Sequence, residues 1–363
     1  MSALSRNERI ALALVVLVTV LAGSAEYGNW AAVPSFALAT LALAGLAWIV
    51  SFSTEDLGRR FGPGVTGMMQ STLGNLPELF VVVFALQKGE SVVAQTAIIG
   101  SIFANALLVL GLVLVVGARR APDGIMRFAV RLPKDTATLL QVTVFIIVLL
   151  GLSLAAHDPA SHHVDTISAV GAVCLLLVYM AWVVPYLRSD ELPGAKDADG
   201  TEDGEDEPHG PRMPLAFTLT LLIVAGVASA FVSDWFINAL EPAIVQLHIS
   251  QAFAGLVIVA IAGNAVENVT GLVLAYKGKS DLAISVVKNS VAQIAAFLFP
   301  LLVLISFALK TTLTFALAPV YIGALVLTAL ALDQITSDGE AAEFEGWALV
   351  ALYVILATLT LFE

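Results

Sequence analysis

The sequence predicts an all-α polytopic membrane protein with about eleven transmembrane helices, one N-terminal helix followed by two inverted five-helix repeats. Of its 363 residues 59% are hydrophobic and only 13% are charged, whereas a soluble domain carries about 25% charged residues. The apolar runs are long enough for membrane-spanning helices and do not alternate like barrel strands. In addition, a Gly-Asn-x-x-Glu phrase occurs twice, 189 residues apart.

The apolar runs follow one another along the whole chain. About 20 apolar residues cross a bilayer as a helix. We expect helices at 9–25, 31–53, 65–87, 91–117, 135–156, 163–187, 214–233, 249–276, 281–309, 312–332 and 345–362.

Positive charge predicts how these helices are oriented, because cytoplasmic loops carry the excess of lysine and arginine. With the N-terminus inside, fourteen of the 17 basic residues fall in inner loops. Lys88 and Lys310 fall in outer loops, and Lys288 lies within a span. We therefore expect a multi-pass protein of the cell membrane with a cytoplasmic N-terminus and an outer C-terminus.

The span count divides the chain into four parts: an N-terminal helix (1–30), a first repeat (31–187), a linker (188–213) and a second repeat (214–363). Because each repeat has an odd number of spans, the second enters the membrane from the opposite side, as in transporters with inverted repeats. The polar linker carries nine acids, so we expect it to be cytosolic and without a fold of its own.

The first copy of the phrase reads Gly74-Asn75-Leu76-Pro77-Glu78. A glutamate inside a membrane span is costly and marks a functional site by default. Pro77 removes a backbone donor and Gly74 allows an irregular turn, so we expect a broken helix with free carbonyl oxygens. Such oxygens, together with Asn75 and Glu78, are ligands that Ca²⁺ prefers.

The second copy, Gly263-Asn264-Ala265-Val266-Glu267, lacks the proline, so any bend must come from Gly263. The helix after each copy adds further polar residues at helical spacing, and Ser101 and Ser290 share the offset of 189. We predict one composite cation- and proton-binding site from four helices: Asn75, Glu78, Ser101, Asn105, Asn264, Glu267, Ser290 and Gln293. Taken singly, the amides and hydroxyls could equally hold helices together.

Two carboxylates in a low-dielectric cavity repel each other when both are ionised. Glu78 and Glu267 can hold a divalent cation or protons, but not both well, and this competition is a physical basis for exchange. We predict no catalytic residues and no cofactor apart from the transported ions. No phosphate-binding Gly-rich phrase is present, and no basic patch suggests nucleic-acid binding.

At these residues the chain resembles the calcium/proton antiporters of the cation/Ca²⁺ exchanger superfamily, over nearly its full length. The similar segments include both Gly-Asn-x-x-Glu phrases, Gly100–Asn105, Leu108–Gly111, Glu241–Ala243, Ala275–Lys277, Ser290–Ala295, Ser337–Glu340 and Glu345–Gly346. The resemblance implies an eleven-helix exchanger in which Glu78 and Glu267 bind Ca²⁺ and protons. It also implies homo-oligomers, commonly trimers, and places Glu55, Asp338 and Glu340 near the cytosolic mouth, where they would act in selectivity or gating.

The chain departs from the family pattern in its second half. Asn268 follows Glu267 where the family commonly has histidine, and Lys288-Asn289-Ser290 replaces a phrase with glycine before the serine. Lys288 would either extend its ammonium to the cytosolic surface or pair with Glu267. In the second case its charge would weaken Ca²⁺ binding and favour a monovalent ion.

Three alternatives to Ca²⁺/H⁺ exchange remain. A Na⁺/H⁺ or Na⁺/Ca²⁺ exchanger of the same superfamily would use the same residues, and Pro77-Glu78 resembles its sodium/calcium branch. A passive channel can also contain inverted repeats. An intramembrane hydrolase is the weakest, because no His-Glu-x-x-His phrase or aspartate pair is present.

Overall fold

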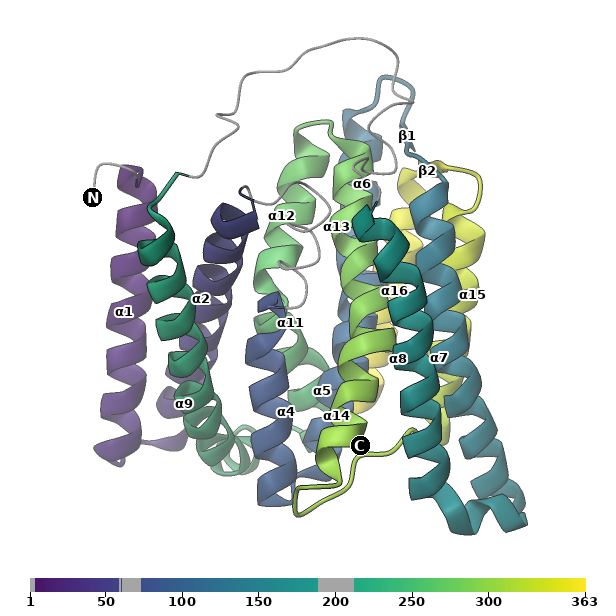
Figure 1. Cartoon of the computed structure of the whole chain (residues 1–363), viewed down its shortest axis with the longest axis horizontal. Helices are drawn as coiled ribbons and strands as arrows, with labels where there is room; N and C mark the ends of the chain where they lie inside the picture. The colour runs from purple at the N-terminus through teal and green to yellow at the C-terminus, as the bar shows by residue number, and fades with distance from the viewer. Residues whose placement is uncertain (1–3, 59, 61–72, 189–211) are drawn as a thin grey trace.

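The computed structural model describes residues 4–58, 60, 73–188 and 212–363 as a bundle of long helices (Figure 1). The first half contains α1 (Arg6–Tyr27), α2 (Ala32–Gly58), α4 (Leu76–Lys88), α5 (Ser91–Phe103), η1 (Ala104–Val109), α6 (Leu110–Arg120), α7 (Arg131–Ala156), η2 (Pro159–His163) and α8 (Val164–Arg188). The second contains α9 (Leu215–Leu247), α10 (Gln251–Phe253), η3 (Ala254–Val259), α11 (Ala260–Gly263), α12 (Ala265–Tyr276), α13 (Ser280–Gln293), η4 (Ile294–Leu298), α14 (Phe299–Ser306), α15 (Pro319–Thr336) and α16 (Glu343–Leu361).

Within these ranges, nine helices are long and apolar enough to cross a membrane, or ten if the bent pair Gln251–Gly263 and Ala265–Tyr276 counts as one span. This confirms an all-α polytopic membrane fold. The helix expected at 65–87 is described only from residue 73 and appears as α4. The count of eleven and the inverted repeats therefore stay predictions, and most of the linker 188–213 lies outside the described residues.

Two expected helix boundaries are wrong. The helix expected to end at 233 continues to Leu247, because Asp234 pairs with Lys88 at 2.5 Å and does not end the helix. The helix expected from 312 begins at Pro319, since the residue before a proline is driven out of the helical region, and Ala318 is extended. The segment before it is held by side-chain hydroxyls: Ser306 Oγ accepts from Leu313 N at 2.8 Å and Ser168 Oγ from Phe315 N at 3.3 Å.

Three of the long spans contain a π-helical segment, which the sequence did not predict. These segments are η1, η3 and η4. Segments η1 and η4 follow Ser101 and Ser290 at nearly the same position in each half. Single π-helical turns inside α-helices often occur at functional sites.

A two-stranded antiparallel ribbon joins the two halves at one end of the bundle. Strand β1 (Ile125–Arg127) lies between α6 and α7, and β2 (Glu340–Ala342) lies between α15 and α16. Figure 1 shows this ribbon, the start of α1 and the α12–α13 turn at the same end of the molecule. That end is the one we expect to face the cytoplasm.

Glycines let the two halves touch backbone to backbone. A Cβ on Gly100 of α5 would lie 2.5 Å from the Cα of Leu256 in η3. A Cβ on Gly346 of α16 would lie 2.5 Å from the carbonyl oxygen of Gly111 in α6, and the reverse distance is 2.6 Å. Small residues at such crossings allow helices in membranes to approach closely, so no side chain separates the halves at these points.

Candidate functional site

Both copies of the repeated phrase interrupt a helix at their asparagine. Asn75 (φ −83°, ψ 6°) is the residue just before α4, and Asn264 (φ −99°, ψ 18°) is the residue just before α12. The second span bends by 59° between α11 and α12, so this copy of the phrase breaks its helix without a proline. Glu78 and Glu267 then lie in the first turn of their helices, where the positive end of the helix dipole favours a carboxylate.

Glu78 lies at the centre of a buried hydrogen-bond network that joins the two halves. Its side chain is 4% exposed. Its Oε1 accepts hydrogen bonds from Ser101 Oγ and from Asn264 Nδ2. A residue of the first half and a residue of the second therefore hold the same carboxylate oxygen.

The amides of Asn264 and Asn105 extend this network. Asn264 Nδ2 also donates to Ser101 Oγ at 2.9 Å, and Asn264 Oδ1 accepts from Asn105 Nδ2 at 2.8 Å. Asn105 Nδ2 donates in addition to the Ser101 carbonyl at 3.0 Å. The structure thus brings together Glu78, Ser101, Asn105 and Asn264, four of the eight predicted ligands.

Each motif glycine faces the glutamate of the other motif. A Cβ on Gly263 would lie 2.6 Å from Cγ of Glu78, and a Cβ on Gly74 would lie 3.0 Å from Oε1 of Glu267. The duplicated phrases therefore meet as a pair, with the two carboxylates on opposite sides of one crossing.

Several oxygens at this crossing have no hydrogen-bond partner in the part of the chain that the structure describes. They are Glu78 Oε2 and Asn105 Oδ1, both buried; Ser290 Oγ on α13 lacks a partner as well. Buried polar groups are normally satisfied, so a free carboxylate oxygen and a free amide oxygen in one network fit a hard cation. Within the described ranges no cluster of three or more His, Cys, Asp or Glu side chains exists, so neutral oxygens would have to complete any coordination shell.

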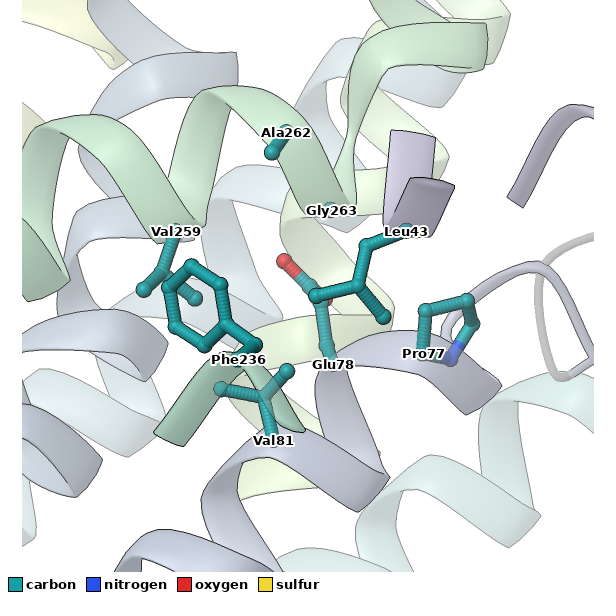
Figure 2. A pocket seen from close by; sticks show the side chains of 8 residues that line it. All are labelled: Leu43, Pro77, Glu78, Val81, Phe236, Val259, Ala262 and Gly263. Carbon is teal, nitrogen blue, oxygen red and sulfur yellow. The ribbon is translucent and has the colours of Figure 1, made fainter. Parts of the chain in front are cut away.

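A small cavity of about 10 Å³ lies beside Glu78, roughly the space that one water molecule needs. Figure 2 shows the Glu78 carboxyl directed toward Gly263, with Leu43 of α2 and Phe236 of α9 next to it. Because most of the wall is apolar, this side of the site excludes bulk water, and electrostatic interactions there are strong.

Of the other four predicted ligands, Glu267 is half-buried, and the remaining three are buried outside this network. Ser290 and Gln293 are 3% and 4% exposed on α13, which packs against the η1 segment that carries Asn105. Asn75 is 5% exposed, and its side chain does not cap α4.

Both expectations for Lys288 are wrong. It is fully buried on α13, so it does not reach the surface, and its Nζ donates to Thr336 Oγ1 of α15 at 2.6 Å instead of pairing with Glu267. A helix turns about 100° per residue, so Lys288 projects about 160° away from Ser290.

The acids expected at the cytosolic mouth lie at the ribbon end or on α2. Glu340 pairs with Arg127 at 3.1 Å across the ribbon, and Asp338 Oδ1 accepts from Glu340 N at 3.1 Å. Glu55 is exposed near the end of α2. Its neighbour Asp56, which the sequence did not single out, is 3% exposed and accepts from Arg212 N at 2.7 Å and Thr218 Oγ1 at 2.8 Å.

A model of the family described as sodium/calcium exchanger protein matches residues 31–186 and 217–362. The chain is 31% identical to the Ca(2+)/H(+) antiporter of Synechocystis, over 98% of this chain and 97% of that protein. It is 31% identical to the vacuolar calcium ion transporter of Schizosaccharomyces pombe, over 92% of this chain and 80% of the other. The chain is 26% identical to the Ca(2+)/H(+) antiporter ChaA of Bacillus subtilis, over 91% of this chain and 92% of that protein.

Solved structures are similar over the same extent. The structure of native YfkE superposes with a TM-score of 0.79 at 25% identity, covering 97% of this chain and all of that one. The structure of the H+/Ca2+ exchanger CAX gives a TM-score of 0.72 at 13% identity, covering 98% of this chain and 93% of that one. The two proteins therefore share the fold.

Proposed function

The chain belongs to the sodium/calcium exchanger protein family, and from this premise we propose that it is a secondary antiporter that exchanges Ca²⁺ for protons by alternating access. The observation that carries the proposal is the crossing of the two phrases. There Glu78 lies next to Gly263 and Glu267 lies next to Gly74, so each glutamate meets the glycine of the opposite half.

Competition between ions follows from charge. Two nearby carboxylates in a dry site repel each other when ionised, and either one divalent cation or two protons neutralise both. Ca²⁺ would bind to Glu78 and Glu267, with Asn75, Ser101, Asn105, Asn264, Ser290 and Gln293 supplying neutral oxygens. The unpaired oxygens of Glu78, Asn105 and Ser290 support this role.

Alternating access would require the halves to expose the crossing to each side of the membrane in turn. We further propose that Glu55, Asp338 and Glu340 lie on the cytosolic side, with the N-terminus and the acidic linker, and that the C-terminus lies outside. The gathering of basic loops at the ribbon end supports this orientation. A homo-oligomer remains part of the proposal.

Ca²⁺ uptake into proteoliposomes under an imposed proton gradient tests the function. Wild type should take up Ca²⁺ and release protons, whereas Glu78→Gln and Glu267→Gln should each lose most uptake. Asp165→Asn, an exposed acid in the first turn of α8, serves as the control and should keep it. Wild-type rates in both glutamine variants would refute the site, and Na⁺-dependent flux without Ca²⁺ flux would favour a Na⁺ exchanger.

A further inference from the structure

Lys288 is a fully buried cation on the helix that carries two of the candidate ligands. Its side chain is 0% exposed within α13, two residues before Ser290. Burying an ammonium in a membrane span is expensive unless it is paired and hydrogen-bonded. Most buried side chains of the bundle are apolar, so a buried lysine on this helix requires an explanation.

The ammonium ends at the C-terminus of α15. Its Nζ donates to Oγ1 of Thr336, the last residue of that helix, at 2.6 Å. The nearby Asp333 carboxylate attracts it. The carbonyl end of a helix favours a cation, so three features of α15 hold the Lys288 ammonium in place.

The same end of α15 leads directly into the ribbon. The chain continues from Thr336 to β2, whose residues pair with β1. The first turn of α13 is tied to this region as well, because Asp281 Oδ1 accepts from Ala129 N, just after β1, at 2.7 Å. Helix α13 is thus fixed at its start and at its middle to one structure built from both halves.

We propose that Lys288 is a positioning residue, which sets the rotation and height of α13 and so aims Ser290 and Gln293 at the cation site. This inference rests on the proposed function of that site and adds how helix α13, which carries two of its ligands, is kept in position. Lys288 does not touch the cation; it acts through α13.

A direct electrostatic role of Lys288 predicts the opposite change in cation affinity when the lysine is replaced. If the Lys288 charge repelled the cation through space, its removal would strengthen cation binding, and Thr336→Val, which keeps the charge, would have no effect. If Lys288 positions α13, both substitutions weaken binding, because each breaks the same hydrogen bond.

Ca²⁺ uptake kinetics of Lys288→Met, Thr336→Val and the double variant distinguish these roles. We expect Lys288→Met to raise KM for Ca²⁺ about tenfold, the lower end of what losing an outer-shell partner costs metal affinity, with little change in maximal rate. Thr336→Val should shift KM in the same direction. The double variant should be no worse than Lys288→Met, since contacts that act as one unit are not additive. Lys288→Arg should restore part of the affinity.

The control is Thr358→Val, which removes an exposed hydroxyl on α16. A lower KM in Lys288→Met, or an unchanged KM with only a lower melting temperature, would overturn the proposal. If Lys288→Met does not fold, Thr336→Val decides by itself. If wild type exchanges Na⁺ and not Ca²⁺, the proposed function fails, and the same variants are read on Na⁺, so the two failures remain distinct.

Discussion

Gly263 and Glu78 are in contact across the two halves, since a Cβ on Gly263 would lie 2.6 Å from the Cγ of Glu78. We predict that Gly263→Ala pushes Glu78 away from Ser101 and Asn264 and lowers Ca²⁺ uptake at least about tenfold, because small misplacements of a bound group are costly. Gly323→Ala, with nothing within 4 Å of the new methyl group, is the control.

Gly74→Ala should be the milder of the motif substitutions. Among the residues that the structure describes, its Cβ would approach Oε1 of Glu267 alone, at 3.0 Å, the far end of a side chain that can move. Uptake by Gly74→Ala should fall less than uptake by Gly263→Ala. An equal loss in both would mean that backbone flexibility, and not contact with the glutamates, is what the glycines provide.

The two motif asparagines should differ in their effect on stability. Asn264→Ala leaves Glu78 Oε1 with one donor fewer and removes the acceptor of Asn105; an unsatisfied buried group costs about 1–3 kcal/mol. We expect its melting temperature in detergent to fall. Asn75→Ala should reduce Ca²⁺ affinity with a smaller change in melting temperature. A larger fall in melting temperature for Asn75→Ala than for Asn264→Ala would contradict the hydrogen-bond network around Glu78.

Asp56 should stabilise the end of the bundle where α2 ends and α9 begins. It accepts hydrogen bonds from both Arg212 N and Thr218 Oγ1, and hydrogen bonds to a charged group contribute about 1.5–3 kcal/mol each. Thermal unfolding should therefore show Asp56→Asn to be less stable than Thr218→Val, with both below wild type. Equal stability of the two variants would show that Asp56 contributes through one bond only.

Glu90 should give a measurable pH effect on stability at the opposite end of the bundle. Burial and repulsion from Glu241 raise the pKa of Glu90 above its usual range, against the hydrogen bond from Gln251. The ionised form is therefore disfavoured in the fold, and stability falls as pH rises through the raised pKa. Glu90→Gln should melt at a higher temperature than wild type at about pH 8 and at the same temperature near pH 4, where wild-type Glu90 is protonated.

Asp123 should give a pH effect on stability in the direction opposite to that of Glu90. The hydrogen bonds from Arg127 and Ile125 N hold the pKa of Asp123 below its usual range, so the stability it contributes is present at neutral pH and lost on acidification. Asp123→Asn should lower the melting temperature at neutral pH. Shifts of the same direction in the two variants would indicate a general effect of net charge.

The membrane fold follows from the length and hydrophobicity of the apolar runs. The repeated polar phrase directs attention to Glu78, Ser101, Asn105 and Asn264, which the structure joins by hydrogen bonds; that they bind a cation stays a prediction. Lys288 lies neither at the surface nor beside Glu267, and helical periodicity alone puts it on the face opposite Ser290. Asp56 could not be identified, because its partners Arg212 and Thr218 are more than 150 positions away along the chain. The ribbon strands were too short to give a periodic signal.

The touching backbones of Gly100 and Leu256 have a consequence for biosynthesis. The chain is made from its N-terminus, so α5 enters the membrane before η3 is synthesised. Gly100 therefore has no packing partner until Leu256, about 150 residues later, is inserted. Glu78 likewise stays without its Asn264 donor until that segment arrives. A ribosome-stalled first half would therefore hold an incompletely paired carboxylate in the bilayer, and the site would be completed only when the second half inserts.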